Sequence, residues 1–317
     1  MNISALNTVI ATLFILMVCG FICRKARIID DAASKKMSEL ILKIGQPAMI
    51  ISAISGAEYS NENLKSAGII VILGFITYAV TALLAFFICK PFRNPDERKI
   101  TEFSLIFNNC AFIGFPIFEA LLPENGLFLA SFYIISFNIS MWTWGIVILA
   151  RQRDDIKLTV KKAFLNFGTV PCVIGIFIYL LKAPAIGLEL PNVLTKSLGY
   201  LSNLCTPISV LITGALIATR SAKQIFASWK LYFFCFVKLI ALPLIICLLS
   251  KLLRIPNIYA LFATAATALP TASTITMFAE TYDLDSGYSS LTVGVSSLLS
   301  VLTLPLVLML TQKILGT

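Results

Sequence analysis

The 317-residue chain contains no histidine, and charged residues make up only 13% of it. The lack of histidine argues against zinc sites, haem sites and catalysis by imidazole. A water-soluble domain carries about a quarter charged residues, so this chain has too little polar surface to cover a water-soluble globule. Hydrophobic residues reach 58% and the mean hydropathy is +0.90. The composition predicts an integral membrane protein.

Several motifs of soluble catalysis are also missing. The eight cysteines form no CxxC pair and fall almost wholly in apolar runs, where they act as small apolar residues. The sequence has no GxSxG motif, no paired intramembrane aspartates and no nucleotide-binding GxxxxGK[ST] motif. We therefore expect a protein that is not an enzyme, has no metal or other cofactor, and is not itself driven by ATP.

Long apolar runs fill most of the chain. A transmembrane helix needs about 20 mostly apolar residues. The first run lacks a basic region before it and is read as a span, not as a cleaved signal. Short connections between the runs predict a compact all-α bundle without a soluble domain. Ten segments meet or approach the required length: 5–23, 37–55, 67–89, 101–121, 127–150, 163–181, 197–219, 226–249, 258–280 and 287–311.

The basic residues indicate the orientation. Lysine and arginine gather after spans one, three, five and seven, whereas Lys251 and Arg254 fit this alternation less well. The positive-inside rule places those basic loops in the cytoplasm and both termini outside, as for a multi-pass protein of a bacterial plasma membrane. The net charge of +9 then reflects loops beside anionic lipid. No basic patch with interleaved aromatics indicates a nucleic-acid partner.

The prolines suggest that the chain is duplicated. Pro47 in span two corresponds to Pro207 in span seven, and Pro116 in span four corresponds to Pro270 in span nine. Five crossings in each half is an odd number, so the two halves must run in opposite directions. This is the inverted-repeat plan of secondary transporters, whose Gly/Pro-interrupted segments indicate the binding site. The predicted repeats are residues 1–155 and 156–317.

Span four contains FNNCAFIGFP, in which several residues oppose a continuous helix. Pro116 cannot donate a helical hydrogen bond, and Gly114 permits backbone angles that other residues resist. Asn108 and Asn109 provide amides that can satisfy freed backbone groups or hold a polar ligand. An unpaired peptide group costs several kcal/mol in hydrocarbon, so such a break must lie against protein or a watery cavity.

Span nine has a matching stretch, ATAATALPTASTITM. Pro270 is followed there by hydroxyl side chains that include Thr271 and Ser273. If the two breaks cross, each presents a half-helix N-terminus with about half a positive charge, which suits a carboxylate. The alternative interpretation is a proline kink with hydroxyls that only help helices to pack.

Lys238 lies in the middle of span eight, where a charge costs at least ~2.5–3.5 kcal/mol. It can balance a substrate's charge, carry a proton or replace a coupling cation, or it can simply pair with the carbonyls of a broken helix. Glu119, just past the first break, is the other candidate for proton or ion coupling. Asn138 in span five can line the same cavity. Glu102 lies near a span end, and we expect it to be solvated.

Three stretches resemble the auxin efflux carrier family, whose bacterial members are often called malate permeases. They are NNCAFIGFP, VKLIALP and ALPTASTITMFAETYDLD, and the likeness extends over nearly the whole chain. The first fits the family's N-x-x-F-x-G-x-P-like pattern with Asn109, Phe112, Gly114 and Pro116. The long cytoplasmic loop of many plant carriers is missing, because about a dozen residues join spans five and six.

The resemblance implies ten helices in two inverted five-helix repeats, with broken, crossing spans four and nine, related to bile-acid symporters and sodium–proton antiporters. It implies a scaffold of spans one, two, six and seven, often dimeric, and an elevator-like transport domain of spans three to five and eight to ten. We therefore expect a secondary transporter of small organic anions such as dicarboxylates, coupled to H+, to Na+ or to neither. A membrane anion sensor that does not transport is the alternative.

Overall fold

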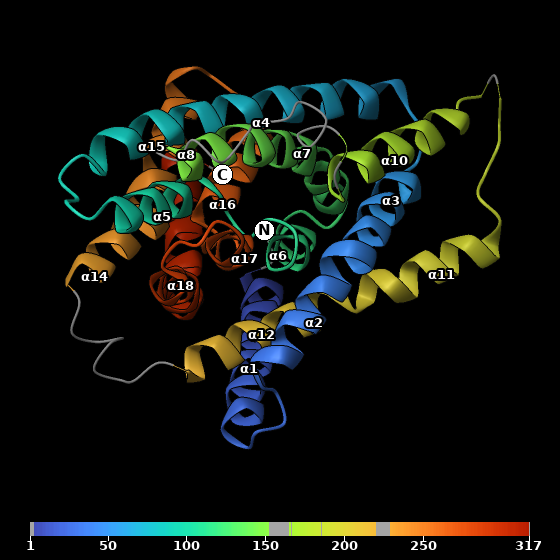
Figure 1. Cartoon of the computed structure of the whole chain (residues 1–317). Coiled ribbons are helices and arrows are strands. Elements are labelled where there is room, and N and C mark those ends of the chain that lie inside the picture. The colour runs from blue at the N-terminus through green and yellow to red at the C-terminus, as the bar shows by residue number, and fades with distance from the viewer. Residues whose placement is uncertain (1–2, 152–164, 166, 185, 220–228, 317) are drawn as a thin grey trace.

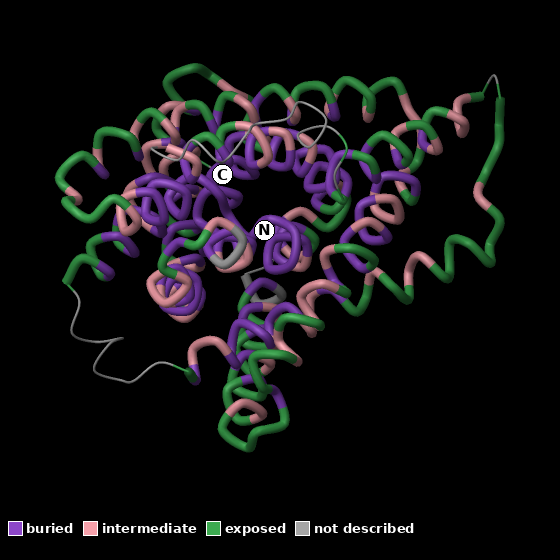
Figure 2. The backbone as a smooth tube through the Cα atoms, in the orientation of Figure 1, coloured by how far each residue is buried: buried purple, intermediate pink, exposed green. Residues whose placement is uncertain are grey.

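The computed structural model describes residues 3–151, 165, 167–184, 186–219 and 229–316. Within these ranges every regular element is a helix and no strand occurs (Figure 1). The helices surround a buried centre that includes α6, α16 and α17, while the outer faces of the bundle are exposed (Figure 2). Large apolar side chains such as Ile72, Val173 and Leu302 are exposed on those outer faces. An apolar surface suits lipid and confirms an all-helical membrane protein.

Seven helices of the described ranges are long and apolar enough to cross a membrane, and some contain a π-helical turn (η). They are α1 (Ile3–Lys25); α2, η1 and α3 (Asp31–Leu40, Ile41–Gly45, Gln46–Gly56); α4 (Asn61–Ile88); α7, η2 and α8 (Gly126–Ser140, Met141–Gly145, Ile146–Ala150); α11 and α12 (Asn192–Asn203, Cys205–Ala218); α14, η3 and α15 (Trp229–Phe236, Val237–Ala241, Leu242–Leu252); and α18 (Ser286–Leu315).

The remaining predicted segments fall on shorter helices. Segment 163–181 corresponds to α10 (Thr169–Leu181), and part of its start lies outside the described residues. Segment 101–121 is split into α5 (Pro95–Ile106) and α6 (Gly114–Leu121). Segment 258–280 is split into α16 (Asn257–Ala268) and α17 (Thr274–Thr281). Every predicted segment thus falls on a helix or an interrupted helix, while ten crossings in two inverted repeats stay a prediction.

Prolines account for two of the π-helical turns. Pro47 and Pro243 each follow such a turn, η1 and η3 respectively. A proline has no N–H, and its ring collides with the carbonyl four residues earlier, which belongs to Lys43 or Leu239 inside the turn. A π-helical turn is wider and removes that collision without ending the helix. Lys238 lies in η3.

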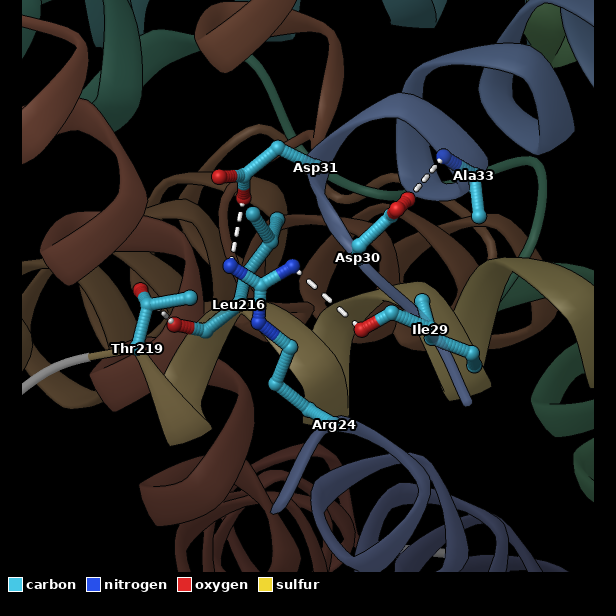
Figure 3. Close-up of polar contacts among 7 residues, drawn as sticks. All are labelled: Arg24, Ile29, Asp30, Asp31, Ala33, Leu216 and Thr219. Atoms are coloured by element: carbon cyan, nitrogen blue, oxygen red, sulfur yellow. Dashed lines mark hydrogen bonds and ion pairs between the residues drawn. The ribbon is translucent and has the colours of Figure 1, made fainter. Parts of the chain in front are cut away.

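The turn between α1 and α2 is held by Arg24. Its guanidinium donates to the carbonyl of Ile29 at 3.3 Å and forms an ion pair with Asp31 at 2.6 Å (Figure 3). Asp30 caps α2 by accepting a hydrogen bond from the N–H of Ala33 at 2.7 Å. These contacts fix the angle at which the chain enters its second long helix.

Helices α1 and α12 pack backbone against backbone through glycine. A Cβ added to Gly214 would lie 2.8 Å from the carbonyl carbon of Met17 and 2.9 Å from the nitrogen of Phe21. Gly20 makes the reciprocal approach, where a Cβ would collide with the backbone of Leu211. Small residues of this kind let membrane helices approach closely and gain van der Waals contact.

We predict that Gly214→Ala lowers the free energy of unfolding by about 1–3 kcal/mol, because α1 and α12 must separate to admit the methyl group. Gly68→Ala is the matched control, since a Cβ there meets open space on α4. That control should be neutral or slightly stabilising, as alanine is the better helix former. Thermal unfolding in detergent measures both, and equal melting temperatures would contradict the packing described.

Candidate functional site: the crossing of two broken helices

The two interrupted helices meet at their breaks. Asn108 and Thr271 form an isolated antiparallel bridge. The N–H of Asn109 donates to the carbonyl of Pro270 at 2.8 Å, and the N–H of Ala272 donates to the carbonyl of Phe107 at 3.1 Å. Each break thus supplies the hydrogen-bond partners that the other has lost, as buried backbone in a membrane requires.

The half-helices on either side pack in pairs. Phe118 of α6 stacks on Phe262 of α16 with ring centroids 4.2 Å apart, and Phe103 of α5 meets Phe278 of α17 at 5.8 Å. Gly114 lies close to the second segment, because a Cβ there would lie 2.9 Å from Cδ1 of Leu269 and that side chain would have to shift. The crossing is therefore a packed unit built from four half-helices.

Lys238 is fully buried and belongs to this unit. Its ammonium donates to the carbonyl of Leu105 at 3.0 Å and to the side-chain oxygen of Asn108. Leu105 lies in the last turn of α5, where helix carbonyls lack partners and carry partial negative charge. Within the described ranges no carboxylate forms an ion pair with Lys238. Of the interpretations that the sequence left open for Lys238, these contacts match the pairing of the lysine with carbonyls of a broken helix.

Thr271 joins three elements. Its hydroxyl donates to the carbonyl of Ser104 at 3.2 Å, and its N–H donates to the hydroxyl of Ser296 on α18 at 3.2 Å. The hydroxyl of Ser104 in turn lies 3.2 Å from that of Thr292. Sequence reasoning missed these partners, although Thr292 and Ser296 are four residues apart and so share one face of α18. Hydroxyl residues that repeat on one helix face could have indicated this contact in the sequence.

Asn109 has a hydrogen-bond donor to spare. Its side-chain oxygen accepts from the N–H of Phe112 at 3.3 Å. Its side-chain nitrogen is buried and has no partner among the described residues. Thr206 of α12 approaches the same turn and donates to the carbonyl of Phe112 at 3.0 Å. An unpartnered buried amide is a strong hydrogen-bond donor for a polar ligand.

A cleft of about 580 Å³ lies beside the crossing. One wall consists of α3 and the region where α11 meets α12, including Ser52, Asn203 and Thr206. The other consists of α6 and the start of α7, including Pro116 and Glu119. The first turn of α6 faces the cleft, so the positive end of that half-helix is near it. Glu119 and Glu124 both line it, and no lysine or arginine of the described residues does.

The other predicted residues occupy different places. Pro270 is buried in the crossing, whereas Ser273 is partly buried at the end of the second break and accepts a hydrogen bond from Thr276 at 2.7 Å. Asn138 is buried against Gly168, where an added Cβ would collide with its amide, and it does not line the cleft. The structure brings Asn138 neither to the crossing nor to the cleft wall.

The expectation for Glu102 was wrong. Its carboxylate is 2% exposed and accepts two hydrogen bonds of 2.9 Å from the guanidinium of Arg151. Proximity to a span end suggested solvent, but the end of α8 covers this turn of α5 and supplies the arginine. A two-pronged pair of this geometry ties α5 to α8 and satisfies both carboxylate oxygens.

An all-helical membrane chain whose two interrupted helices meet beside an open cleft has the features of a transport protein. The chain belongs to the family described as membrane transport protein, which matches residues 6–161 and 156–308. The resemblance to auxin efflux carriers is thereby confirmed.

Two relatives cover nearly the whole chain. An uncharacterized transporter of Methanocaldococcus jannaschii is 22% identical over 302 residues, which are 94% of this chain and 96% of the relative. An uncharacterized transporter of Methanothermobacter thermautotrophicus is 20% identical over 302 residues, 95% of this chain and 96% of the relative. Both names describe transport and neither states a substrate.

We predict that Thr271→Val, which keeps the shape but removes the hydroxyl, destabilises the protein by about 1–3 kcal/mol, because the buried carbonyl of Ser104 loses its partner. Thr12→Val is the matched control, since that exposed hydroxyl bonds only to the carbonyl of Thr8 within its own helix. The control should stay within about 0.5 kcal/mol of the wild type. Melting temperatures in detergent compare the two, and an equal loss in both would contradict the role of Thr271.

Proposed function

We propose that the protein is a secondary transporter of a small organic anion such as a dicarboxylate. The observation that carries the proposal is the hydrogen-bonded crossing of two broken helices beside a cleft of about 580 Å³. Family membership and the transporter names of the relatives support transport itself. A cleft of this volume accommodates a small organic acid.

The anion would bind at the first turn of α6, where Phe115 and Pro116 line the cleft. The positive end of α6 favours a carboxylate there. Asn109 is buried and does not line the cleft in this structure, so its spare amide N–H would have to turn toward the anion when it binds. The hydroxyl of Thr206, at the cleft wall, already donates to the carbonyl of Phe112 and so holds the turn that contains Asn109. Lys238 contributes indirectly by holding Asn108 and the end of α5, since it does not line the cleft.

Glu119 supports coupling to protons. A substrate carboxylate and the carboxylates of Glu119 and Glu124 would share one cleft that no described lysine or arginine lines. Their repulsion is relieved when one carboxyl group binds a proton. We assign this proton to Glu119, because it lies on the broken helix α6 itself, whereas Glu124 lies on the connection to α7. Glu119 would take up a proton with the anion and release it with the anion on the other side.

The proposal includes the finer architecture that the sequence indicates. Ten crossings would form inverted repeats 1–155 and 156–317, in a bacterial plasma membrane with both termini outside. A scaffold of α1, α2–α3, α10 and α11–α12 would dimerise, and the remaining helices would move against it as an elevator. The cleft supports this division, because its two walls come from the two proposed parts.

The first test is uptake of labelled malate by proteoliposomes. Asn109→Ala should raise the Michaelis constant roughly 10- to 100-fold, because a hydrogen bond to a charged ligand is lost. Asn192→Ala, at the exposed start of α11, is the matched control and should behave as the wild type. Unaltered uptake by Asn109→Ala would contradict the site. Thermal stabilisation by organic acids without flux in the wild type would favour the sensor alternative.

The second test concerns Glu119. We expect Glu119→Gln to retain malate exchange at equal pH across the vesicle but to lose accumulation driven by an inward proton gradient. The amide keeps the size of the side chain and cannot exchange a proton. Glu124→Gln, on the connection between α6 and α7, should still accumulate malate. Equal behaviour of the two variants, or gradient-driven uptake by Glu119→Gln, would exclude Glu119 as the proton carrier.

A further inference from the structure

We infer that the ammonium group of Lys238 occupies an alkali-cation site at the crossing, as a cation that is tethered to the chain. The inference deepens the proposed transport function, because it states that sodium does not drive the transport cycle from this position. It rests on the position of the Nζ atom and on the oxygen atoms around it. The side chain is fully buried and donates to two oxygens from the first broken helix.

The end of α5 defines this site. Three carbonyls there accept hydrogen bonds from other elements: those of Ser104, Leu105 and Phe107. The hydroxyl of Thr271 donates to the first at 3.2 Å, and the N–H of Ala272 donates to the third at 3.1 Å. The second break thus supplies partners for two of the three carbonyls. Leu105 receives its partner from Lys238 instead, at 3.0 Å.

The two oxygens that accept hydrogen bonds from Nζ are of the kinds that also bind metal cations. Main-chain carbonyl and amide oxygens suit hard cations such as Na+, and the C-terminal ends of broken helices coordinate Na+ in secondary transporters. Leu105 and Asn108 provide one oxygen of each kind. Within the described ranges no carboxylate is paired with the lysine, so the negative end of α5 is the balancing charge.

The tether has a functional consequence. A bound Na+ leaves the site when the gradient favours it, and its release can drive a transport cycle. A lysine in the π-helical turn η3 stays with the protein in every state. The oxygens of Leu105 and Asn108 therefore have a partner without sodium, and a sodium gradient supplies no driving force at this position.

The test measures ion binding and needs no substrate. Purified wild type, Lys238→Ala and Lys238→Arg are melted in NaCl, LiCl, KCl or choline chloride at equal ionic strength. Wild type should melt at the same temperature in all four salts. Lys238→Ala should melt lower in choline chloride and regain roughly 2–4 °C in at least one alkali chloride, since an ion that binds only the folded state stabilises it. Lys238→Arg keeps the charge and should ignore the choice of salt.

A second substitution tests whether the side-chain oxygen of Asn108 binds the alkali ion. In the double variant Asn108→Ala with Lys238→Ala, the alkali-specific rise should disappear. A folded Lys238→Ala protein that melts alike in all four salts would overturn the inference. If Lys238→Ala does not fold, the wild type decides: stabilisation by Na+ over choline overturns the inference, and indifference supports it.

The outcome is separate from that of malate uptake. An alkali response of Lys238→Ala in a protein that moves no malate would reject the proposed substrate and keep the cation site. If the wild type takes up malate and the melting temperature of Lys238→Ala does not depend on the salt, the proposed substrate is kept and the cation site is rejected.

Discussion

The structure depends on one constraint: a peptide group buried in a membrane must find a hydrogen-bond partner within the protein. Two helices of this chain are interrupted where lipid would otherwise surround them, and each interruption is paired with the other. The N–H of Asn109 meets Pro270, and the N–H of Ala272 meets Phe107. The flanking aromatic pairs and the close approach at Gly114 support these hydrogen bonds, because they hold the two segments at hydrogen-bonding distance.

The polar side chains around the crossing provide hydrogen-bond partners for further backbone groups. Thr271 and Lys238 reach the carbonyls at the end of α5, and Thr206 reaches the carbonyl of Phe112. A buried lysine, which would be costly alone, here satisfies a carbonyl and an amide oxygen at the negative end of a helix. Asn109 differs from these residues, because its side-chain nitrogen has no partner in the described part of the chain. A polar ligand that accepts a hydrogen bond from this nitrogen would gain binding free energy, because the group has no other partner to give up.

Much of this could be predicted from the sequence, since the signals are local. Adjacent asparagines followed by Gly114 and Pro116 identify the first break, and Pro270 with its hydroxyls identifies the second. The contacts that join them could not be predicted, because they depend on tertiary packing: Lys238 gave no indication that its partner is Leu105, and Ser296 looked like any small helix residue. Glu102 was misjudged for the same reason, since nothing near it in sequence announces Arg151. The role of Glu119 in proton or ion coupling and those of Asn138 and Ser273 in binding stay predictions.

The way the crossing is held also bears on how such a protein can move. Backbone hydrogen bonds run between the breaks in both directions, and α18 adds Ser296 and Thr292 to the same network. Separating the two breaks would leave several buried peptide groups unpaired at once. On the cleft side, the described residues of α12 contribute to the crossing only the hydrogen bond from Thr206 to Phe112. Motion that keeps the crossing intact would avoid this cost, which is the reason for proposing an elevator in place of a mechanism that opens the crossing itself.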